Sequence, residues 1–259
     1  MTLTAAPEPN VDDVAASSSI AKAAKVLRAL ASMGGRGSGV TELSVHAGLA
    51  KSTTHRILAE LISERLVAHS GPKYQLGPGW FLLQGALASS EWVRLVEQAR
   101  VPLARLFERT QATVHLGVLH DDQVLYLEKL TASGGTVVPT RVGGYMPATC
   151  TALGKSLLAF DPPVLRSVVS RPLPARAAGS IIAPGQLYRQ IDQIRQEGVA
   201  YDKEESRAGV YCVAAPIFHD GKAVASVSVT RVGSRGLGPN DASAARRTAG
   251  EIEEWLCAN

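Results

Sequence analysis

Two helical patterns of apolar and polar residues, separated by a tight turn, lie between Thr41 and Glu64. In the first pattern Leu43 and Val45 precede Gly48, and the turn continues from there to Lys51. The second pattern has the i, i+1, i+4, i+5 spacing of an amphipathic helix, with Ile57, Leu58, Leu61 and Ile62 as its apolar residues. Two short helices joined by a tight turn predict a helix-turn-helix that binds DNA.

The second helix of this pair has a polar face that suits DNA. Projection at about 100° per residue places Thr54 with the apolar residues on the inward face. The opposite stripe consists of Ser52, Arg56, Ala59 and Ser63, with Thr53 and His55 on its flanks. Because hydroxyls and a forked cation read base edges and phosphates, we predict DNA contacts from Lys51, Ser52, Thr53, His55 and Arg56. A solvated amphipathic helix would show the same pattern.

The segment that follows predicts a wing. Leu66 to His69 and Tyr74 to Leu76 are predicted strands, and the turn between them ends at Lys73, where a cation can contact phosphate. Upstream, Ser19 is a predicted N-cap for a helix that ends at Gly34-Gly35, with Ile20, Ala24, Leu27 and Leu30 at helical spacing. Residues 18–78 are therefore predicted to form a winged helix-turn-helix domain.

The chain of 259 residues is long enough for two domains. The first 17 residues are acidic and proline-rich and predict a disordered tail. Residues 79–90 predict an apolar linker helix, which either docks on the next domain or pairs with its copy in a second subunit. No apolar run is long enough for a membrane span and no signal peptide is evident, so we expect a cytoplasmic protein without a membrane partner.

Positive charge is concentrated in the predicted DNA-binding part. The segment from Ser18 to Trp80 carries eight lysines and arginines against three glutamates, a net charge of +5, whereas the whole chain carries +4. A basic patch of this size is what phosphate neutralisation requires.

The cysteines and the Gly154-Lys155-Ser156 motif do not predict a cofactor or a metal site. Cys150, Cys212 and Cys257 are odd in number and far apart, which fits neither a disulfide framework nor paired-cysteine zinc spacing. A phosphate-binding loop needs a glycine five positions before Gly154, and this position is Thr149. We expect the motif to begin a packed helix, and His115, His120 and His219 to be ordinary strand or turn residues.

The remaining residues, 91–259, mix helices and strands. Predicted helices cover Trp92–Phe107, Thr151–Phe160, Pro184–Glu197 and Asp241–Leu256. Predicted strands cover Thr113–Leu119, Gln123–Lys129, the region around Thr136–Arg141, Tyr211–Phe218 and Ala223–Arg231. The fold class is therefore α+β, with a curved antiparallel sheet in the C-terminal domain.

From Ser18 to Cys257 the chain resembles the IclR-type transcriptional regulators. The residues that carry the resemblance are GLAKSTTHRIL from Gly48, YQLGP from Tyr74, PATCTALGKSLLA from Pro147, GVAYDKEE from Gly198 and GVYCVAAPI from Gly209. The resemblance implies a winged-helix domain, a linker helix and a GAF-like domain that binds a small organic acid or a related metabolite. It also implies a homodimer or homotetramer that binds double-stranded operator DNA.

The resemblance also implies an effector site. The matching residues of this sequence are Ala152 and Leu153 in the loop before Gly154, together with Asp202, Cys212, Ser228 and Thr230. From Ala225 to Thr230 apolar residues alternate with hydroxyls, so one face of this strand is hydroxyl-lined, as a solvent-facing strand would also be. The loop from Thr149 to Leu153 is bulkier than glycine-containing versions in the family. This disfavours glyoxylate-like effectors and leaves aromatic acids open.

The leading hypothesis is a non-enzymatic regulator, a repressor whose operator affinity changes when the effector binds. Two alternatives remain open at this point. One is a small-molecule enzyme that uses Cys212 or Asp202 and is fused to a DNA-binding module. The other is a thiol-based redox sensor, because a cysteine with a lowered pKa is reactive.

Overall fold

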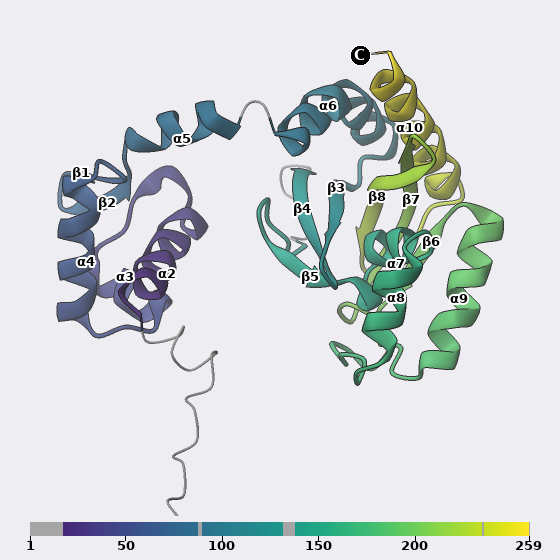
Figure 1. The fold of residues 1–259 in the computed structure, drawn as a ribbon, viewed down its shortest axis with the longest axis horizontal. Coiled ribbons are helices and arrows are strands. Elements are labelled where there is room, and N and C mark those ends of the chain that lie inside the picture. The colour runs from purple at the N-terminus through teal and green to yellow at the C-terminus, as the bar shows by residue number, and fades with distance from the viewer. Residues whose placement is uncertain (1–17, 88–89, 132–137, 235, 259) are drawn as a thin grey trace, which may run out of the picture. The chain divides into compact units, whose positions relative to one another are not determined.

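The computed structural model describes residues 18–87, 90–131, 138–234 and 236–258, which fall in two compact units, Met1–Ser89 and Ser90–Asn259 (Figure 1). The predicted tail, residues 1–17, lies outside the described residues, as do residues 88 and 89 of the predicted linker. Each unit has a hydrophobic core of its own. No helix within the described ranges combines the length and apolar character needed to cross a membrane.

The first unit is a winged helix-turn-helix. Its elements are α2 (Ser19–Ser32), η1 (Gly34–Arg36), α3 (Val40–Ala47), α4 (Lys51–Ser63), β1 (Val67–Ser70), β2 (Lys73–Leu76) and α5 (Gly79–Leu87). Ser18, not Ser19 as predicted, caps α2, because its hydroxyl accepts a hydrogen bond from the Ala21 amide at 3.0 Å. The predicted apolar face of α2 is confirmed in part: Leu30 is buried and Leu27 packs against the core, whereas Ile20 is 81% exposed and Val26 and Ala29 are buried in addition.

The turn between α3 and α4 forms as the sequence predicts. Gly48 has φ +63°, a left-handed conformation that favours glycine, and the Leu49 amide donates to the Ser44 carbonyl at 3.0 Å. Leu43 packs into the core of this unit together with the buried face of α4. Val45 instead is 74% exposed, although it belongs to the apolar pattern of the first helix.

The wing is a two-stranded hairpin that contacts the segments on either side of the helices. β1 and β2 are antiparallel, with Ser70 opposite Lys73, and an isolated bridge joins Ser38 to Tyr74. After the hairpin, Gly77 passes so close to the backbone of the preceding segment that an added Cβ would lie 2.4 Å from the Arg65 carbonyl oxygen. Only glycine fits there, which is the physical reason for the glycine at the wing exit.

The second unit is built on a six-stranded antiparallel sheet in the order β5-β4-β3-β8-β7-β6. The strands are β3 (Thr113–His120), β4 (Gln123–Leu130), β5 (Tyr145–Pro147), β6 (Ala200–Lys203), β7 (Val210–His219) and β8 (Lys222–Val232). The helices are α6 (Glu91–Thr110), η2 (Ala148–Cys150), α7 (Ala152–Leu158), α8 (Pro162–Val169), α9 (Pro184–Glu197) and α10 (Asp241–Cys257). The α+β prediction is confirmed.

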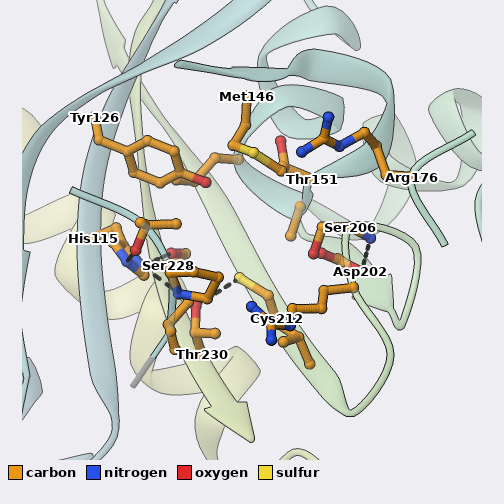
Figure 2. Close-up of a pocket in the computed structure, with 17 residues that line it drawn as sticks. His115, Tyr126, Met146, Thr151, Arg176, Asp202, Ser206, Cys212, Ser228 and Thr230 are labelled. Carbon is orange, nitrogen blue, oxygen red and sulfur yellow. Dashed lines mark hydrogen bonds between the residues drawn. The ribbon is translucent and has the colours of Figure 1, made fainter. Parts of the chain in front are cut away.

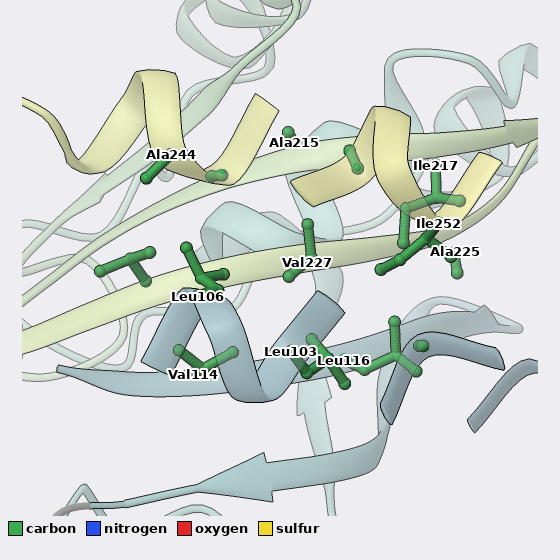
Figure 3. Close-up of a cluster of buried hydrophobic side chains, with 14 of the residues drawn as sticks. Leu103, Leu106, Val114, Leu116, Ala215, Ile217, Ala225, Val227, Ala244 and Ile252 are labelled. Carbon is green, nitrogen blue, oxygen red and sulfur yellow. The ribbon is translucent and has the colours of Figure 1, made fainter. Parts of the chain in front are cut away.

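Helices cover both faces of this sheet. Alternate residues of β3, β7 and β8 pack against α6 and α10, with Leu116, Ala215 and Val227 near the centre of that core (Figure 3). The other face packs against α7, α8 and α9. On β8 the hydroxyl residues lie on this second face, where Ser226 and Ser156 of α7 form a hydrogen bond of 2.7 Å. The hydroxyl-lined face of β8 is therefore buried and is not a solvent-facing surface.

Three features of this unit differ from the predictions. The described part of the predicted strand around Thr136–Arg141, residues 138–141, has no strand structure, and the short strand β5 follows it instead. Residues 136 and 137 lie outside the described residues. Helix α8 and strand β6 were not predicted. β6 is only four residues long, and a strand this short gives little periodicity to detect.

Candidate functional site

Helix α4 presents the polar stripe that the sequence predicts. Lys51, Ser52, His55 and Arg56 are exposed and Thr53 is half-buried. The opposite face of the helix is buried in the core of the first unit and consists of Thr54, Ile57, Leu58 and Leu61. The core thus fixes the orientation of α4 and leaves its stripe accessible.

The start of α4 is favourable for phosphate. The N-cap residue is Ala50, which has no side chain to accept from the first backbone amides, and the first turn contains no acidic residue. Free amides and the positive end of the helix dipole favour an anion at this position. On the wing, Lys73 is exposed at the first position of β2, directly after the Gly71-Pro72 turn.

The second unit contains a cavity of about 370 Å³ between the sheet and α7 (Figure 2). Its lining includes all six residues implied by the resemblance, namely Ala152, Leu153, Asp202, Cys212, Ser228 and Thr230. These residues come from α7, β6, β7 and β8, so the fold brings together side chains that lie up to 78 positions apart in the chain. The volume is in the range of cavities that bind small molecules.

The cavity also includes residues that sequence reasoning missed. His115 and Tyr126 contribute the only aromatic rings of the described lining residues, and their ring centroids lie 5.1 Å apart. His115 is a strand residue, as expected, but it lies opposite Ser228 in the β3–β8 pairing and so shares the hydroxyl-lined face. The alternation of β3 contained this signal, but only the register between β3 and β8 shows which residues His115 faces.

The buried wall of the cavity is a hydrogen-bonded network of neutral groups. His115 Nε2 lies 2.7 Å from the Thr140 hydroxyl, and His115 Nδ1 lies 3.5 Å from Ser228 Oγ and 3.4 Å from Thr230 Oγ1. Burial, together with the nearby charge of Lys129, lowers the pKa of His115 to about 3. The imidazole is therefore neutral at physiological pH and offers one donor and one acceptor.

Lys129 holds one side of this wall in place. Its ammonium donates to the carbonyls of Val138 and Thr140, each at 2.7 Å. Both of these residues line the cavity. The irregular segment that replaces the predicted third strand is thus fastened to β4 by a side chain.

Cys212 and Asp202 do not have the features of a catalytic pair. Burial raises the pKa of the Cys212 thiol to about 12, and Thr230 Oγ1 donates to its sulfur at 3.1 Å. A thiol that stays protonated is a poor nucleophile and a poor redox sensor. Burial also raises the pKa of Asp202 to about 6, and Asp202 Oδ1 accepts from the amides of Glu205 and Ser206 at 2.8 and 3.3 Å. The buried, protonated thiol of Cys212 therefore fits neither a catalytic nucleophile nor a redox sensor.

The Gly154-Lys155-Ser156 motif begins a packed helix, as expected. An added Cβ on Gly154 would lie 2.2 Å from the Ala148 carbonyl oxygen, so α7 can approach the preceding turn only because this residue is glycine. Lys155 is fully buried, and its ammonium lies 2.6 and 2.5 Å from the two carboxylate oxygens of Glu205 and 2.7 Å from Gln190 Oε1. Sequence reasoning missed this ion pair, because its partners are 50 residues apart.

Comparison with protein families gives two matches. The family described as "IclR helix-turn-helix domain" matches residues 19–71, and the family described as "Bacterial transcriptional regulator IclR C-terminal" matches residues 88–250. The HTH-type transcriptional regulator KdgR of Dickeya chrysanthemi is 33% identical over 218 residues, which cover 82% of this chain and 70% of the relative. KdgR of Escherichia coli K12 is 32% identical over 218 residues, which cover 82% of this chain and 81% of the relative.

Solved structures agree with these matches. An IclR homologue from Microbacterium hydrocarbonoxydans, solved in complex with 4-hydroxybenzoate, has a TM-score of 0.79 and 26% identity, with 93% of this chain and 100% of that chain covered. The Agrobacterium tumefaciens repressor BlcR has a TM-score of 0.58 and 25% identity, with 92% of this chain and 96% of that chain covered. All four of these relatives are described as regulators, repressors or regulator homologues, and none as an enzyme.

Proposed function

This chain belongs to the IclR family of bacterial transcriptional regulators, and from that membership we propose that it is a repressor whose operator affinity is set by an aromatic or other small organic acid. The observation that carries the DNA-binding part is the exposed polar stripe on α4, oriented by a buried face on the same helix. In this proposal Ser52, Thr53, His55 and Arg56 contact bases or phosphates in the major groove, and Lys51 lies at the start of the helix. Lys73 on the wing contacts phosphate.

The effector part of the proposal rests on the cavity between the sheet and α7. Ala152, Leu153, Asp202, Cys212, Ser228 and Thr230 would line the bound molecule. An aromatic acid is supported by Tyr126 and Met146, which add apolar surface to this lining, and by the relative solved with 4-hydroxybenzoate. Cavities of this kind bind a ring by apolar contact and orient it through a few polar groups.

We further propose that the functional form is a homodimer or homotetramer. Helix α5 supports this, because Phe81 and Leu82 are 78% and 81% exposed and no residue of the helix is buried. Exposed apolar side chains on one short helix are typical of an interface with a second copy. A symmetric dimer would bind two half-sites on the operator, and the effector would shift the population between forms of high and low DNA affinity.

The test is a mobility-shift titration of DNA fragments from upstream of the gene, with and without a panel of aromatic and aliphatic acids. We expect a sequence-specific shift that weakens as salt increases, and release of the DNA by at least one acid. Release by an acid would support the effector part of the proposal. The sign of regulation is measured as expression from the same promoter with and without the protein, and lower expression without it would contradict repression.

Variants at two arginines test the role of α4. Arg56→Ala should lower the affinity for the specific fragment about tenfold or more, because a good base or phosphate contact contributes about 1–3 kcal/mol. Arg189→Ala is the matched control, since it removes one exposed arginine from the other unit. Equal affinity of both variants for the fragment would contradict the assignment of α4 as the DNA-reading helix.

A further inference from the structure

Two exposed arginines line the cavity, and neither belongs to the effector residues discussed so far. Arg176 lies in the loop between α8 and α9, and Arg207 lies in the loop between β6 and β7. Both are exposed, and neither guanidinium has an ion-pair partner within the described residues. In Figure 2, Arg176 lies beside the cavity on the side opposite Thr230.

Arg176 marks the boundary of the cavity. It also lines a neighbouring cavity of about 420 Å³, so this residue borders both spaces. The lining of the cavity therefore combines two kinds of polar group. His115, Ser228 and Thr230 form a neutral network, and Arg176 and Arg207 add two cations.

The charges of the cavity favour an anion. Among the 17 described residues that line it, Asp202 is the only carboxylate, whereas Arg176 and Arg207 are permanently charged. Asp202 is already engaged by two backbone amides. Arg176 and Arg207 thus line a space large enough for a small molecule and have no ion-pair partner among the described residues.

The loops that carry the arginines are tied to each other. Ser180 Oγ accepts from the amides of Arg176 and Ala177 at 2.8 and 2.9 Å and donates to the Glu205 carbonyl at 2.7 Å. Gly179 packs so closely on the second loop that an added Cβ would lie 2.8 Å from the Glu204 carbonyl oxygen. These contacts fix the Arg176 loop against the segment that leads to Arg207.

The second loop is in turn anchored beneath the cavity. The Glu205 carboxylate pairs with the buried Lys155 of α7, and the Glu205 amide donates to Asp202. Glu205 thus links α7, the Ser180 loop and the loop of Arg207. Because the backbone of both loops is held in this way, less ordering of the loops is needed when a ligand binds the two arginines.

We propose that Arg176 and Arg207 form an anion clamp that binds the carboxylate of the effector and makes the cavity select acids over neutral analogues of the same shape. The inference rests on the proposed function, because it assigns an orientation to the effector of the same cavity. A guanidinium binds a carboxylate through two parallel N–H···O bonds, which gives both strength and direction. The other end of the molecule then lies against His115, Ser228 and Thr230, which suit a hydroxyl or a carbonyl.

The experiment compares pairs of ligands that differ only in charge. Binding of 4-hydroxybenzoate and 4-hydroxybenzamide, and of further acid and amide pairs from the same panel, is measured by calorimetry on the full chain. The wild-type protein should bind one acid at least about tenfold more tightly than its amide, since charge-assisted hydrogen bonds are about twice as strong as neutral ones. Arg176→Gln and Arg207→Gln should each lower the affinity for the acid about tenfold and leave the affinity for the amide nearly unchanged.

Arg171→Gln is the matched control. Arg171 is also an exposed arginine of this region, but it pairs with Asp122 at 3.1 Å and lines the neighbouring cavity only. It should leave the discrimination between acid and amide as in the wild type. Acid binding that both Arg176→Gln and Arg207→Gln leave unchanged would overturn the clamp, while the proposed function would stand. Failure of every acid to bind the wild-type chain would overturn the effector part of the proposed function and the clamp with it.

Discussion

The polar stripe of α4 and the polar wall of the cavity use similar residue types in opposite environments. The stripe exposes Ser52 and Arg56 to solvent, and the hydrophobic core lies behind them on the same helix. The wall buries Ser228 and Thr230 between the sheet and α7, where Ser228 lies next to His115 and Thr230 donates to Cys212. In the proposed function a hydroxyl therefore serves recognition on α4, whereas in the cavity it would serve both recognition and stability.

This difference predicts how separable function and stability are in each region. Exposed side chains contribute little to folding, so changes on α4 should affect DNA binding alone. Buried polar groups are costly when they lose a partner, so changes around the cavity should affect the fold as well as the ligand. The following predictions test this contrast, beginning with the largest effect.

Lys155→Met should destabilise the second unit by about 3–5 kcal/mol, because it leaves the Glu205 carboxylate buried and unpaired. Hydrogen exchange of peptides from β7 and β8 during urea titration measures this loss without interference from the first unit. The exposed Lys222→Met is the control and should change stability by less than about 0.5 kcal/mol. The double variant Lys155→Met with Glu205→Met should recover most of the loss, and a single variant as stable as the control would refute the role of the pair.

Asp202→Asn should change the pH dependence of stability. Burial raises the pKa of folded Asp202 to about 6, so the folded protein keeps a proton that the unfolded chain releases above its ordinary pKa of 3.8. The contribution of Asp202 to the free energy of unfolding therefore falls as pH rises from 3.8 to about 6. Burial lowers the pKa of folded His115 to about 3, so the folded protein stays unprotonated at this residue where the unfolded chain binds a proton, below pH 6.5. The contribution of His115 to the free energy of unfolding therefore falls as pH decreases. The two slopes oppose each other in the wild type.

Without the Asp202 slope, the variant should lose stability more steeply than the wild type when the pH is lowered from about 6 to about 4, by up to about 1.4 kcal/mol per pH unit. Thermal or urea unfolding across this range, followed in the second unit, is the measurement. Asp220→Asn is the control, because the Asp220 side chain is 90% exposed in a turn. Parallel pH curves for Asp202→Asn and the wild type would show that Asp202 does not hold its proton in the folded state across this window.

A pair of serine substitutions gives the smallest effect and the most direct comparison. Ser228→Ala should cost about 1 kcal/mol of stability, because it removes a hydroxyl next to the buried His115 imidazole. Ser52→Ala should leave stability within about 0.5 kcal/mol and weaken DNA binding. Urea unfolding of both variants, combined with mobility shift, measures the contrast. Equal losses of stability in Ser228→Ala and Ser52→Ala would contradict the proposed difference between the cavity wall and the stripe of α4.

The first unit was largely predictable because its signals are local. The inward and outward faces of α4 follow from helical periodicity, and the turn follows from a glycine in the left-handed conformation. Two details were predicted wrongly. Ser18 rather than Ser19 caps α2, and the apolar side chains of Ile20 and Val45 are exposed instead of buried. Helical spacing alone does not show which apolar residues are buried, because burial depends on where the neighbouring helices pack.

The second unit was predictable in its longer elements and not in its irregular ones. β7 and β8 are ten and eleven residues long and contain the predicted strands Tyr211–Phe218 and Ala223–Arg231, and α9 has the bounds that its apolar spacing predicts. The segment from residue 138 to 141 contains Pro139, which disfavours a strand interior, and Lys129 holds part of it in an irregular path by donating to its carbonyls. These hydrogen bonds come from a side chain and not from a neighbouring strand, so the apolar and polar pattern of the segment does not indicate them.

The sequence by itself determined the α+β class, the stripe on α4 and the six cavity residues implied by the family resemblance, because each is written in a continuous stretch or a recognisable motif. Only the tertiary structure decided that His115 faces Ser228, that Lys155 pairs with Glu205, and that Arg176 and Arg207 border the same cavity. These relations depend on strand register and on contacts between loops distant in the chain. Strand register and loop packing depend on how all side chains of the core pack together, so local periodicity in the sequence does not predict them.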